Sequence, residues 1–340
     1  MTDFSGFLSI ARSGRPLAGA EMRAAMDALL EGNVAADSIA EFLLAIRNRG
    51  ETVEELIAAA EAMRARAIRV EAPEGAVDTC GTGGDGADTF NISTAAALVV
   101  AGCGVPVAKH GNRAASSKSG SSDVLAALGV NISASPSTIA RCIRDANVGF
   151  MFAAYHHRAV AHVADVRKRL GVRTIFNLLG PLSNPAGAKR QLMGIYDRTL
   201  TEPLAAALGA LGAERVWVVA GKDGLDELTT TTSSYVSEYH DGAVRNFEIF
   251  PEDVGIERSS LESLKGGKPA ENAATIRELL HGRPGPFRDI TVLNAAAALV
   301  ISSRAKSLRH GAELAALSID SGRASEALEK LIAISHEPDR

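Results

Sequence analysis

The chain has 340 residues, of which 46% are hydrophobic and 22% charged, and its formal net charge is -4. This length and apolar content allow a sizeable core, whereas acidic and basic residues mixed along the chain without a long basic run disfavour nucleic acid as a partner. Three widely spaced cysteines, no signal-peptide pattern and no uncharged apolar stretch of membrane-spanning length indicate a cytoplasmic protein without a disulfide framework, a zinc ribbon or a membrane span.

Residues 1–72 carry only helical patterns, and we expect a small all-helical domain on which some later helices can pack. One helix is expected to end near Leu30, and another to cover 51–66. The helix between them is expected to present four apolar side chains on one face, Ile39, Phe42, Leu43 and Ile46. Pro-Glu-Gly at 73–75 then interrupts the pattern and marks the start of a second domain, 73–340.

From residue 73 the pattern alternates between short apolar segments and helical segments. Strands are expected at 76–80, 105–108, 149–154, 192–196 and 215–220. Helices are expected at 93–101, at 123–128, at 136–146 and in a segment that ends near 211. This alternation predicts a larger α/β domain with a mostly parallel central sheet and helices on its faces. Asp241-Gly242 indicates the turn of a hairpin over 235–250, and the remainder of the chain returns to helical patterns.

The first expected strand ends in a glycine-rich turn, DTCGTGGDG at 78–86, and NIST at 91–94 then begins a helix. Glycines let backbone N–H groups approach a ligand closely, and the helix start adds unpaired donors and a partial positive charge. Together they indicate an anion site suited to phosphate or pyrophosphate. The alternative is a tight turn that binds nothing, and the pattern matches neither the GxGxxG nor the GxxxxGK(S/T) motif of nucleotide-binding loops.

A second loop follows the next expected strand and reads KHGNRAASSKSGSSD at 109–123. Its lysines and arginine supply positive charge, and its five serines and main-chain amides supply directed donors, so a loop of this kind can close over a polyphosphate. A solvated linker is the alternative. Ligands of α/β sheets gather at the carboxyl ends of strands, where both loops begin, and this position favours the binding interpretation.

Two further stretches carry charge. Residues 155–185 are locally basic, and a metal site from His157, His162 and Asp165 is conceivable there. A spacing of five does not place the two histidines on one helix face, however, and a solvated basic helix is the alternative. At 223–227 the sequence DGLDE follows an expected strand. Its adjacent carboxylates suit a hard divalent cation such as Mg²⁺, although an ordinary acidic turn is common.

The chain resembles the anthranilate phosphoribosyltransferase family in five segments that occur in the order GTGGD, NIST, KHGNRAASSKSGSSDVLAALG, VRKRLGVRTIFNLLGPLSNPA and DGLDE. The resemblance implies the fold of nucleoside phosphorylases and phosphoribosyltransferases, and an enzyme of tryptophan biosynthesis. Such an enzyme transfers the 5-phosphoribosyl group of phosphoribosyl pyrophosphate (PRPP) to the amine of anthranilate, giving N-(5-phosphoribosyl)anthranilate and pyrophosphate. The resemblance also implies Mg²⁺ as cofactor and a homodimer formed through the N-terminal helices.

The same resemblance implies roles for individual residues. Anthranilate is expected to meet Gly81, Asn112 and Arg167, and a guanidinium fork matches a carboxylate in two-point geometry. Mg²⁺ is expected to be held by Asp226 and Glu227, with help from Ser93. The implied PRPP site comprises Gly81, Gly84, Asp85, Thr89, Asn91, Ile92, Ser93, Thr94, Lys109, His110, Gly111, Asn112, Arg113, Ala114, Ala115, Ser116, Ser117 and Ser121. No acid–base residue is assigned, because direct displacement at the ribose C1 needs only alignment and leaving-group stabilisation.

The chain departs from the family next to its paired histidines. The family usually has proline after the second histidine, with Met and Lys soon after, whereas this chain has Arg158, Val160 and Ala161. The departure bears on the shape of the anthranilate entrance and leaves Arg167 untouched.

Two other functions compete with this interpretation. A pyrimidine nucleoside phosphorylase shares the architecture, but its second loop reads differently and it needs no acidic pair for magnesium. A non-catalytic, nucleic-acid-binding relative would need a strong positive surface field, and the net charge of -4 argues against one.

Overall fold

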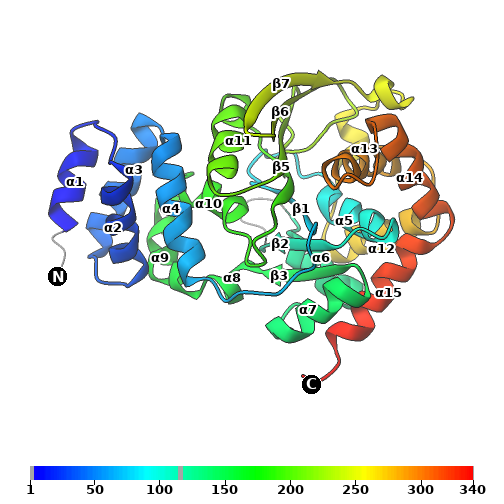
Figure 1. The fold of residues 1–340 in the computed structure, drawn as a ribbon, viewed down its shortest axis with the longest axis horizontal. Helices are drawn as coiled ribbons and strands as arrows, with labels where there is room; N and C mark the ends of the chain where they lie inside the picture. Colours follow the sequence, from blue (N-terminus) through cyan, green and yellow to red (C-terminus); the bar gives the residue numbers. More distant parts are fainter. Residues whose placement is uncertain (1–3, 114–117, 340) are drawn as a thin grey trace.

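Four helices open the chain in the computed structural model, which describes residues 4–113 and 118–339 (Figure 1). They are α1 (Phe4–Arg12), α2 (Gly19–Leu30), α3 (Ala36–Arg49) and α4 (Val53–Arg66). α4 begins with a capping box, in which Thr52 Oγ1 accepts a hydrogen bond from the backbone N–H of Glu55. α3 buries the predicted apolar stripe, with exposures of 2% or less at Ile39, Phe42, Leu43 and Ile46.

A seven-stranded sheet forms the centre of the remaining chain, in the order β3-β2-β1-β4-β5-β6-β7. Its strands are β1 (Val77–Gly81), β2 (Val107–Gly111), β3 (Val148–Phe152), β4 (Arg190–Gly194), β5 (Arg215–Gly221), β6 (Ser234–His240) and β7 (Ala243–Ile249). β1 to β5 are parallel, and β6 and β7 extend one edge in antiparallel fashion. Asp241 and Gly242 both have positive φ, as a two-residue hairpin turn requires. The predicted parallel sheet and hairpin are therefore confirmed.

The central strands end at the same edge of the sheet. β1 lies between β2 and β4, and the parallel register places Gly81 opposite Gly194 at the ends of β1 and β4. On its other side β1 pairs with β2, with Val77 opposite Val107. The chain passes from β1 toward β3 on one side and resumes at β4 on the other. Ligands of open α/β sheets bind at such a switch point, outside the carboxyl ends of the strands.

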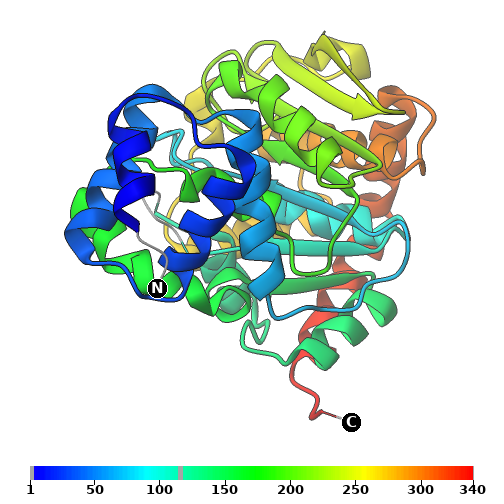
Figure 2. The ribbon, with the colours of Figure 1, turned by 60° about the vertical axis from the view of Figure 1, so that its left-hand side comes forward.

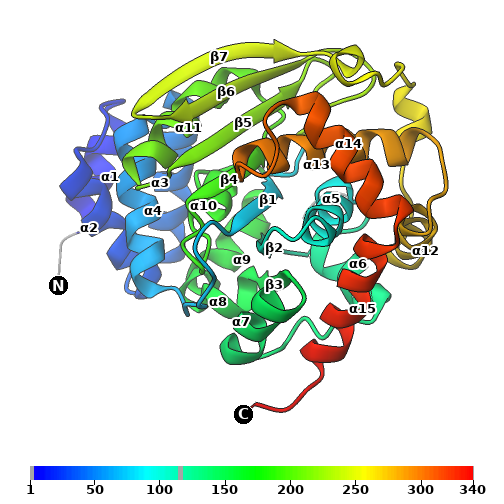
Figure 3. The same cartoon turned by 45° about the vertical axis from the view of Figure 1, so that its right-hand side comes forward.

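Helices pack on both faces of the sheet (Figures 1 and 3). Those between β1 and β5 are α5 (Ile92–Gly102), α6 (Ser121–Leu128), α7 (Pro136–Asp145), α8 (Ala153–His156), α9 (Ala161–Leu170), α10 (Phe176–Leu182) and α11 (Thr201–Ala210). The chain ends in α12 (Pro269–Leu280), α13 (Pro286–Ile301), α14 (Leu308–Asp320) and α15 (Arg323–Ser335). α5 packs against β1, α13 and α15, and its alanine and valine side chains are buried. The alternating α/β architecture is as the sequence predicts.

Three later helices pack on the N-terminal helices. α9 lies against α2 and α3, and both α10 and α11 lie against α4 (Figure 2). Arg64 of α4 ties these layers together, because its Nε donates to the carbonyl of Leu182 at 2.7 Å and its Nη1 to that of Leu211 at 2.9 Å. The N-terminal helices are thus joined to the sheet through α9, α10 and α11.

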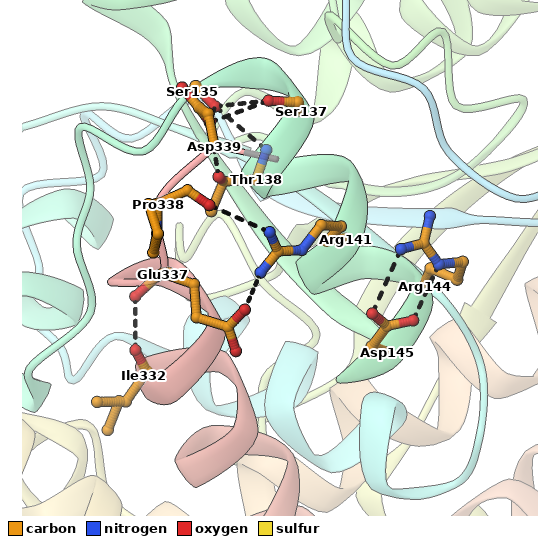
Figure 4. Close-up of polar contacts among 11 residues, drawn as sticks. Ser135, Ser137, Thr138, Arg141, Arg144, Asp145, Ile332, Glu337, Pro338 and Asp339 are labelled. Carbon is orange, nitrogen blue, oxygen red and sulfur yellow. Dashed lines mark hydrogen bonds and ion pairs between the residues drawn. The ribbon is translucent and has the colours of Figure 1, made fainter.

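The C-terminal tail is fixed to the start of α7 (Figure 4). Asp339 accepts hydrogen bonds from Ser135, Ser137 and Thr138, and these bonds lower the pKa of its carboxyl. Arg141 of α7 pairs with Glu337 and donates to the carbonyl of Pro338.

None of the helices in the described ranges is both long enough and apolar enough to cross a membrane.

Candidate active site

A cavity of about 320 Å³ opens at the carboxyl ends of β1 and β2. Seventeen of the residues expected to bind substrate or metal line it: Gly81, Gly84, Asp85, Thr89, Asn91, Ile92, Ser93, Thr94, Lys109, His110, Gly111, Asn112, Arg113, Ser121, Arg167, Asp226 and Glu227. The four others, Ala114, Ala115, Ser116 and Ser117, lie outside the described residues. The structure thus brings segments from four distant parts of the sequence to one cavity.

The glycine-rich turn curls around the side chain of Asp226. Gly83 and Gly84 have φ values of 64° and 85°, a backbone region that side chains disfavour. This conformation lets the N–H of Gly83 donate to Asp226 Oδ2 at 2.7 Å. At Gly81 an added Cβ would collide with the same carboxylate oxygen, so a side chain there would displace the carboxylate. The turn therefore places backbone donors and a carboxylate side by side.

Asp226 and Glu227 lie on the loop after β5, which is held from two sides. Asp223 Oδ2 accepts hydrogen bonds from Thr229 Oγ1 at 2.7 Å and from Thr231 Oγ1 at 2.5 Å. Asn294 of α13 accepts from the N–H of Leu228 at 3.1 Å and donates to its carbonyl at 2.8 Å. These bonds fix the backbone on both sides of the acidic pair, so that its carboxylates reach the cavity.

Burial and neighbouring negative charge both raise the pKa values of the acidic pair. Burial, and then the charge of Asp85, raise the pKa of Asp226 to about 7. Burial, and then the charge of Asp226, raise the pKa of Glu227 well above its usual range. Glu227 Oε1 accepts a hydrogen bond from the N–H of Ser93 at 3.1 Å, at the start of α5. Carboxylates crowded in this way suit a hard divalent cation, whose charge would relieve their repulsion.

Lys109 supplies the positive charge nearest to this acidic end. Its side chain is 2% exposed, and its Nζ donates to the carbonyl of Thr79 at 2.5 Å and to Ser93 Oγ at 3.3 Å. Burial lowers the pKa of Lys109, whereas Asp78 and other neighbouring acids raise it.

In the described ranges no three His, Cys, Asp or Glu side chains already form a metal-ligating group. A cation here would therefore take ligands from substrate or water besides the two carboxylates.

A second group of cavity-lining residues, which we call the basic end, is basic and aromatic. Arg167 of α9 holds its guanidinium carbon 5.3 Å from the ring centre of Phe176, the first residue of α10. Burial lowers the pKa of Arg167, and no neighbouring acid offsets this effect within the described part of the chain. A partly buried guanidinium without a carboxylate partner can accept the carboxylate of a ligand.

The histidines of the predicted alternative metal site do not converge. The ring of His157 lies 5.1 Å from that of His110, whose Nδ1 is 3.2 Å from the carbonyl of Gly180. Burial lowers the pKa of His157 to about 4, so that its ring is neutral near pH 7. His162 instead lies against Gly32 of the N-terminal helices, where an added Cβ would be 2.7 Å from its Nδ1. The two rings thus serve different packing contacts.

Several cavity residues escaped the sequence-based prediction. They are Cys80, Thr82, Gly83, Asp88, Phe90, Ser119, Gly120, Ala153, Phe176, Asn177, Gly180 and Pro181. Phe176, Asn177, Gly180 and Pro181 belong to the motif VRKRLGVRTIFNLLGPLSNPA, which also carries Arg167. For these four residues that motif is the one sequence signal of a site. A mostly apolar helix of this kind is otherwise usually part of a core.

Family models match the chain in two parts. The model described as "Glycosyl transferase family, helical bundle domain" matches residues 6–67, and "Glycosyl transferase family, a/b domain" matches residues 73–325. Anthranilate phosphoribosyltransferase of Rhodospirillum rubrum is 55% identical over 336 residues, which cover 99% of this chain and 97% of that protein. The enzyme of the same name from Beijerinckia indica is 54% identical and covers 100% of this chain and 99% of its own length.

The chain belongs to the anthranilate phosphoribosyltransferase family. Its activity is the one for which the family is named, the transfer of a phosphoribosyl group to anthranilate, and it is a pentosyltransferase. Neither the nucleoside phosphorylase nor the nucleic-acid-binding alternative finds support among these relatives.

Solved structures agree with this assignment. Anthranilate phosphoribosyltransferase from Thermus thermophilus superimposes with a TM-score of 0.92 at 44% identity, covering 97% of this chain and 99% of that one. The enzyme from Saccharomyces cerevisiae, in complex with PRPP and Mg, gives a TM-score of 0.89 at 29% identity, covering 97% and 98%. The predicted fold, a helical N-terminal part and an α/β part with a mostly parallel sheet, is confirmed.

Proposed function

We propose that the two ends of the cavity divide the two substrates of the transfer between them. PRPP binds at the glycine-rich, acidic end together with Mg²⁺, and anthranilate binds at the end that carries Arg167. One observation carries this proposal: a single cavity joins clustered carboxylates and backbone donors to a guanidinium that has no acidic partner in the described ranges. A polyphosphate with its metal ion needs the first environment, and an aromatic acid needs the second.

The PRPP site follows from the donors that the cavity offers. The glycine-rich turn brings its backbone to the cavity beside the first residues of α5, and the buried Lys109 adds an ammonium group. We assign contacts with PRPP to Gly81, Gly84, Asp85, Thr89, Asn91, Ile92, Ser93, Thr94, Lys109, His110, Gly111, Asn112, Arg113 and Ser121. The assignment extends by the family resemblance to Ala114, Ala115, Ser116 and Ser117, outside the described residues.

Asp226 and Glu227 are the proposed Mg²⁺ ligands, with Ser93 assisting from the start of α5. Carboxylate oxygens are the donors that Mg²⁺ prefers, and the two side chains reach the cavity from one loop. Mg²⁺ bound there neutralises charge on the departing pyrophosphate. The solved yeast relative is a complex with PRPP and Mg, which supports Mg²⁺ as the metal.

Anthranilate is placed by Arg167, Asn112 and Gly81. The guanidinium of Arg167 pairs with the carboxylate in two-point geometry, and the ring of Phe176 lies against the guanidinium. The amine then faces the ribose C1, and its nitrogen forms the new bond as the C1–pyrophosphate bond breaks. The electron pair of that bond leaves with pyrophosphate, and the amine releases one proton to water. Alignment and leaving-group stabilisation suffice, so no side chain is assigned as acid or base.

Three further features extend this proposal to the whole molecule. We assign residues 1–72 to a helical domain and 73–340 to the catalytic domain; the family matches at 6–67 and 73–325 support this division, and α9, α10 and α11 pack across it. The protein is proposed to act in tryptophan biosynthesis in the cytoplasm. It is also proposed to form a homodimer through its N-terminal helices, which analytical ultracentrifugation can test.

The decisive experiment follows the fluorescence of anthranilate during incubation with purified protein and PRPP, with and without Mg²⁺. The proposal requires loss of anthranilate fluorescence that depends on both PRPP and Mg²⁺. Consumption of anthranilate at an equal rate in the presence of a chelator would remove Asp226 and Glu227 from their proposed role. No consumption under any condition would reject the substrate assignment.

A further inference from the structure

A segment distant in sequence braces the rim of the cavity from outside. It comprises residues 264–272, which join the short helix η4 (Leu261–Leu264) to the first turn of α12. The N–H of Phe90 donates to the carbonyl of Leu264 at 3.1 Å, and the N–H of Gly266 to that of Asp88 at 2.8 Å. Thr89 and Lys265 form an antiparallel bridge between these bonds. The brace thus pairs, through one isolated bridge, with residues 88–90, which follow the glycine-rich turn.

Asn272 connects the brace to the cavity wall. Its side chain is 1% exposed, and Oδ1 accepts a hydrogen bond from the N–H of Gly267 at 2.7 Å. Its Nδ2 donates to Asn91 Oδ1 at 2.9 Å, and Asn91 lines the cavity whereas Asn272 does not. The amide oxygen of Asn272 is therefore bonded within the brace, and its amide nitrogen is bonded to the cavity wall.

Asn91 continues the connection to the second loop. Its Nδ2 donates to the carbonyl of Ser119 at 3.0 Å, and Ser119 Oγ donates back to Asn91 Oδ1 at 3.2 Å. The donor from Asn272 and the carbonyl of Ser119 require the same orientation of the Asn91 amide, with Oδ1 toward Asn272 and Nδ2 toward that carbonyl. α12, which carries Asn272, also packs on α6, which begins with Ser121 of the cavity wall. One helix thereby contacts the second loop by two routes.

We infer that Asn272 is a positioning residue for PRPP, which acts by fixing the spacing between the glycine-rich turn and the second loop. The inference rests on the proposed function, because both loops are assigned to PRPP. Asn272 acts through Asn91 and touches no substrate itself. Without its donor, the amide of Asn91 loses one of the hydrogen bonds that fix its orientation, and the bond across to Ser119 weakens. Affinity for PRPP then falls, whereas the basic end with Arg167, which Asn272 does not contact, keeps its geometry.

The test uses Asn272→Asp, which keeps the size of the side chain and the acceptor for Gly267 but places an oxygen against Asn91 Oδ1. We expect the KM for PRPP to rise about tenfold, the loss of one buried hydrogen bond, while the KM for anthranilate at saturating PRPP stays within about twofold. The matched control is Asn131→Asp. Its amide donates to the carbonyl of Ser335 and accepts from the N–H of Ser133, away from the cavity, and it should change neither KM.

A second variant approaches the same contact from the backbone. An added Cβ at Gly266 would lie 2.7 Å from the carbonyl oxygen of Thr89, so Gly266→Ala pushes the brace away from the turn. It should also raise the KM for PRPP selectively, and it replaces the first variant if Asn272→Asp does not fold. Equal rises of both KM values, or an unchanged KM for PRPP in a folded variant, would overturn the inference.

Calorimetric titration with PRPP and Mg²⁺ separates this inference from the proposed function. If the wild-type protein binds PRPP but consumes no anthranilate, the proposed transfer fails, and the inference still requires weaker PRPP binding by Asn272→Asp. If the wild-type protein binds no PRPP, both fail together. If wild-type turnover is normal and both variants bind PRPP as the wild type does, only the inference fails.

Discussion

The two ends of the cavity are built in opposite ways. At the acidic end, Asp226 and Glu227 already accept hydrogen bonds from Gly83 and Ser93, and their loop is fixed by neighbours on both sides. At the basic end, Arg167 rests on the ring of Phe176 and has no acidic partner in the described part of the chain. The acidic end is therefore fixed by hydrogen bonds before a ligand binds. At the basic end, the charge of Arg167 is left to pair with the ligand.

This contrast follows from the elements that carry each end. The acidic end lies on loops at the carboxyl edge of the sheet, where the central strands end together. Arg167 lies on α9, which packs on α2 and α3 of the N-terminal helices. Substitutions at the two ends should therefore affect different substrates. If each end affected both substrates equally, the division that we propose would be wrong.

The largest effect is expected from Asp226→Asn. The variant keeps the size of the side chain but removes a charge from the proposed Mg²⁺ site, so kcat/KM should fall by about 100-fold or more. Added Mg²⁺ with PRPP should raise the Tm of the wild-type protein and not that of the variant. Asp241→Asn, at the exposed hairpin turn, is the control with the same chemical change. Wild-type Mg²⁺ dependence in Asp226→Asn would exclude Asp226 as a ligand.

Arg167→Ala should produce the next largest effect, and on anthranilate alone. Losing a charge-assisted pair of hydrogen bonds costs about 1.5–3 kcal/mol, which corresponds to a KM for anthranilate about 10–150 times higher. The KM for PRPP should stay within about twofold, because the acidic end is unchanged. Arg169→Ala is the control on the same helix, where Arg169 pairs with Asp37 at 3.2 Å on the surface. An equal rise in both KM values would contradict the separation of the two ends.

Phe176→Leu should have a smaller effect in the same direction. The leucine keeps an apolar contact but removes the aromatic face that lies under the guanidinium of Arg167. A cation–π contact of this kind contributes about 0.5–1 kcal/mol, so the KM for anthranilate should rise about two- to fivefold. Steady-state kinetics at saturating PRPP measure the change, with Phe247→Leu on β7 as the control. In an Arg167→Ala background Phe176→Leu should have no further effect, and an additive effect would show that Phe176 acts independently.

The sequence predicts one end of the cavity better than the other. The glycine-rich turn, the serine-rich loop and the DGLDE loop are local patterns, and parallel strands bring such loops together at one edge. Residues whose role depends on a distant partner carry no such pattern. The sequence favours a core role for Phe176, because only the structure shows Arg167 against its ring. Asn272 and Asn294 read as ordinary polar residues of helices, because only the fold brings them to Asn91 and to Leu228.

The smallest expected effect concerns stability and tests the contrast from the other side. Arg167→Ala should change the free energy of unfolding by no more than about 0.5 kcal/mol, since it removes a desolvated charge along with its contact to Phe176. Asn294→Ala should instead cost about 1–3 kcal/mol, because it leaves the buried N–H and carbonyl of Leu228 without their partner. Urea denaturation followed by circular dichroism measures both values. A large loss of stability in Arg167→Ala would mean that its guanidinium holds α9 in place, and the basic end would then be as preorganised as the acidic one.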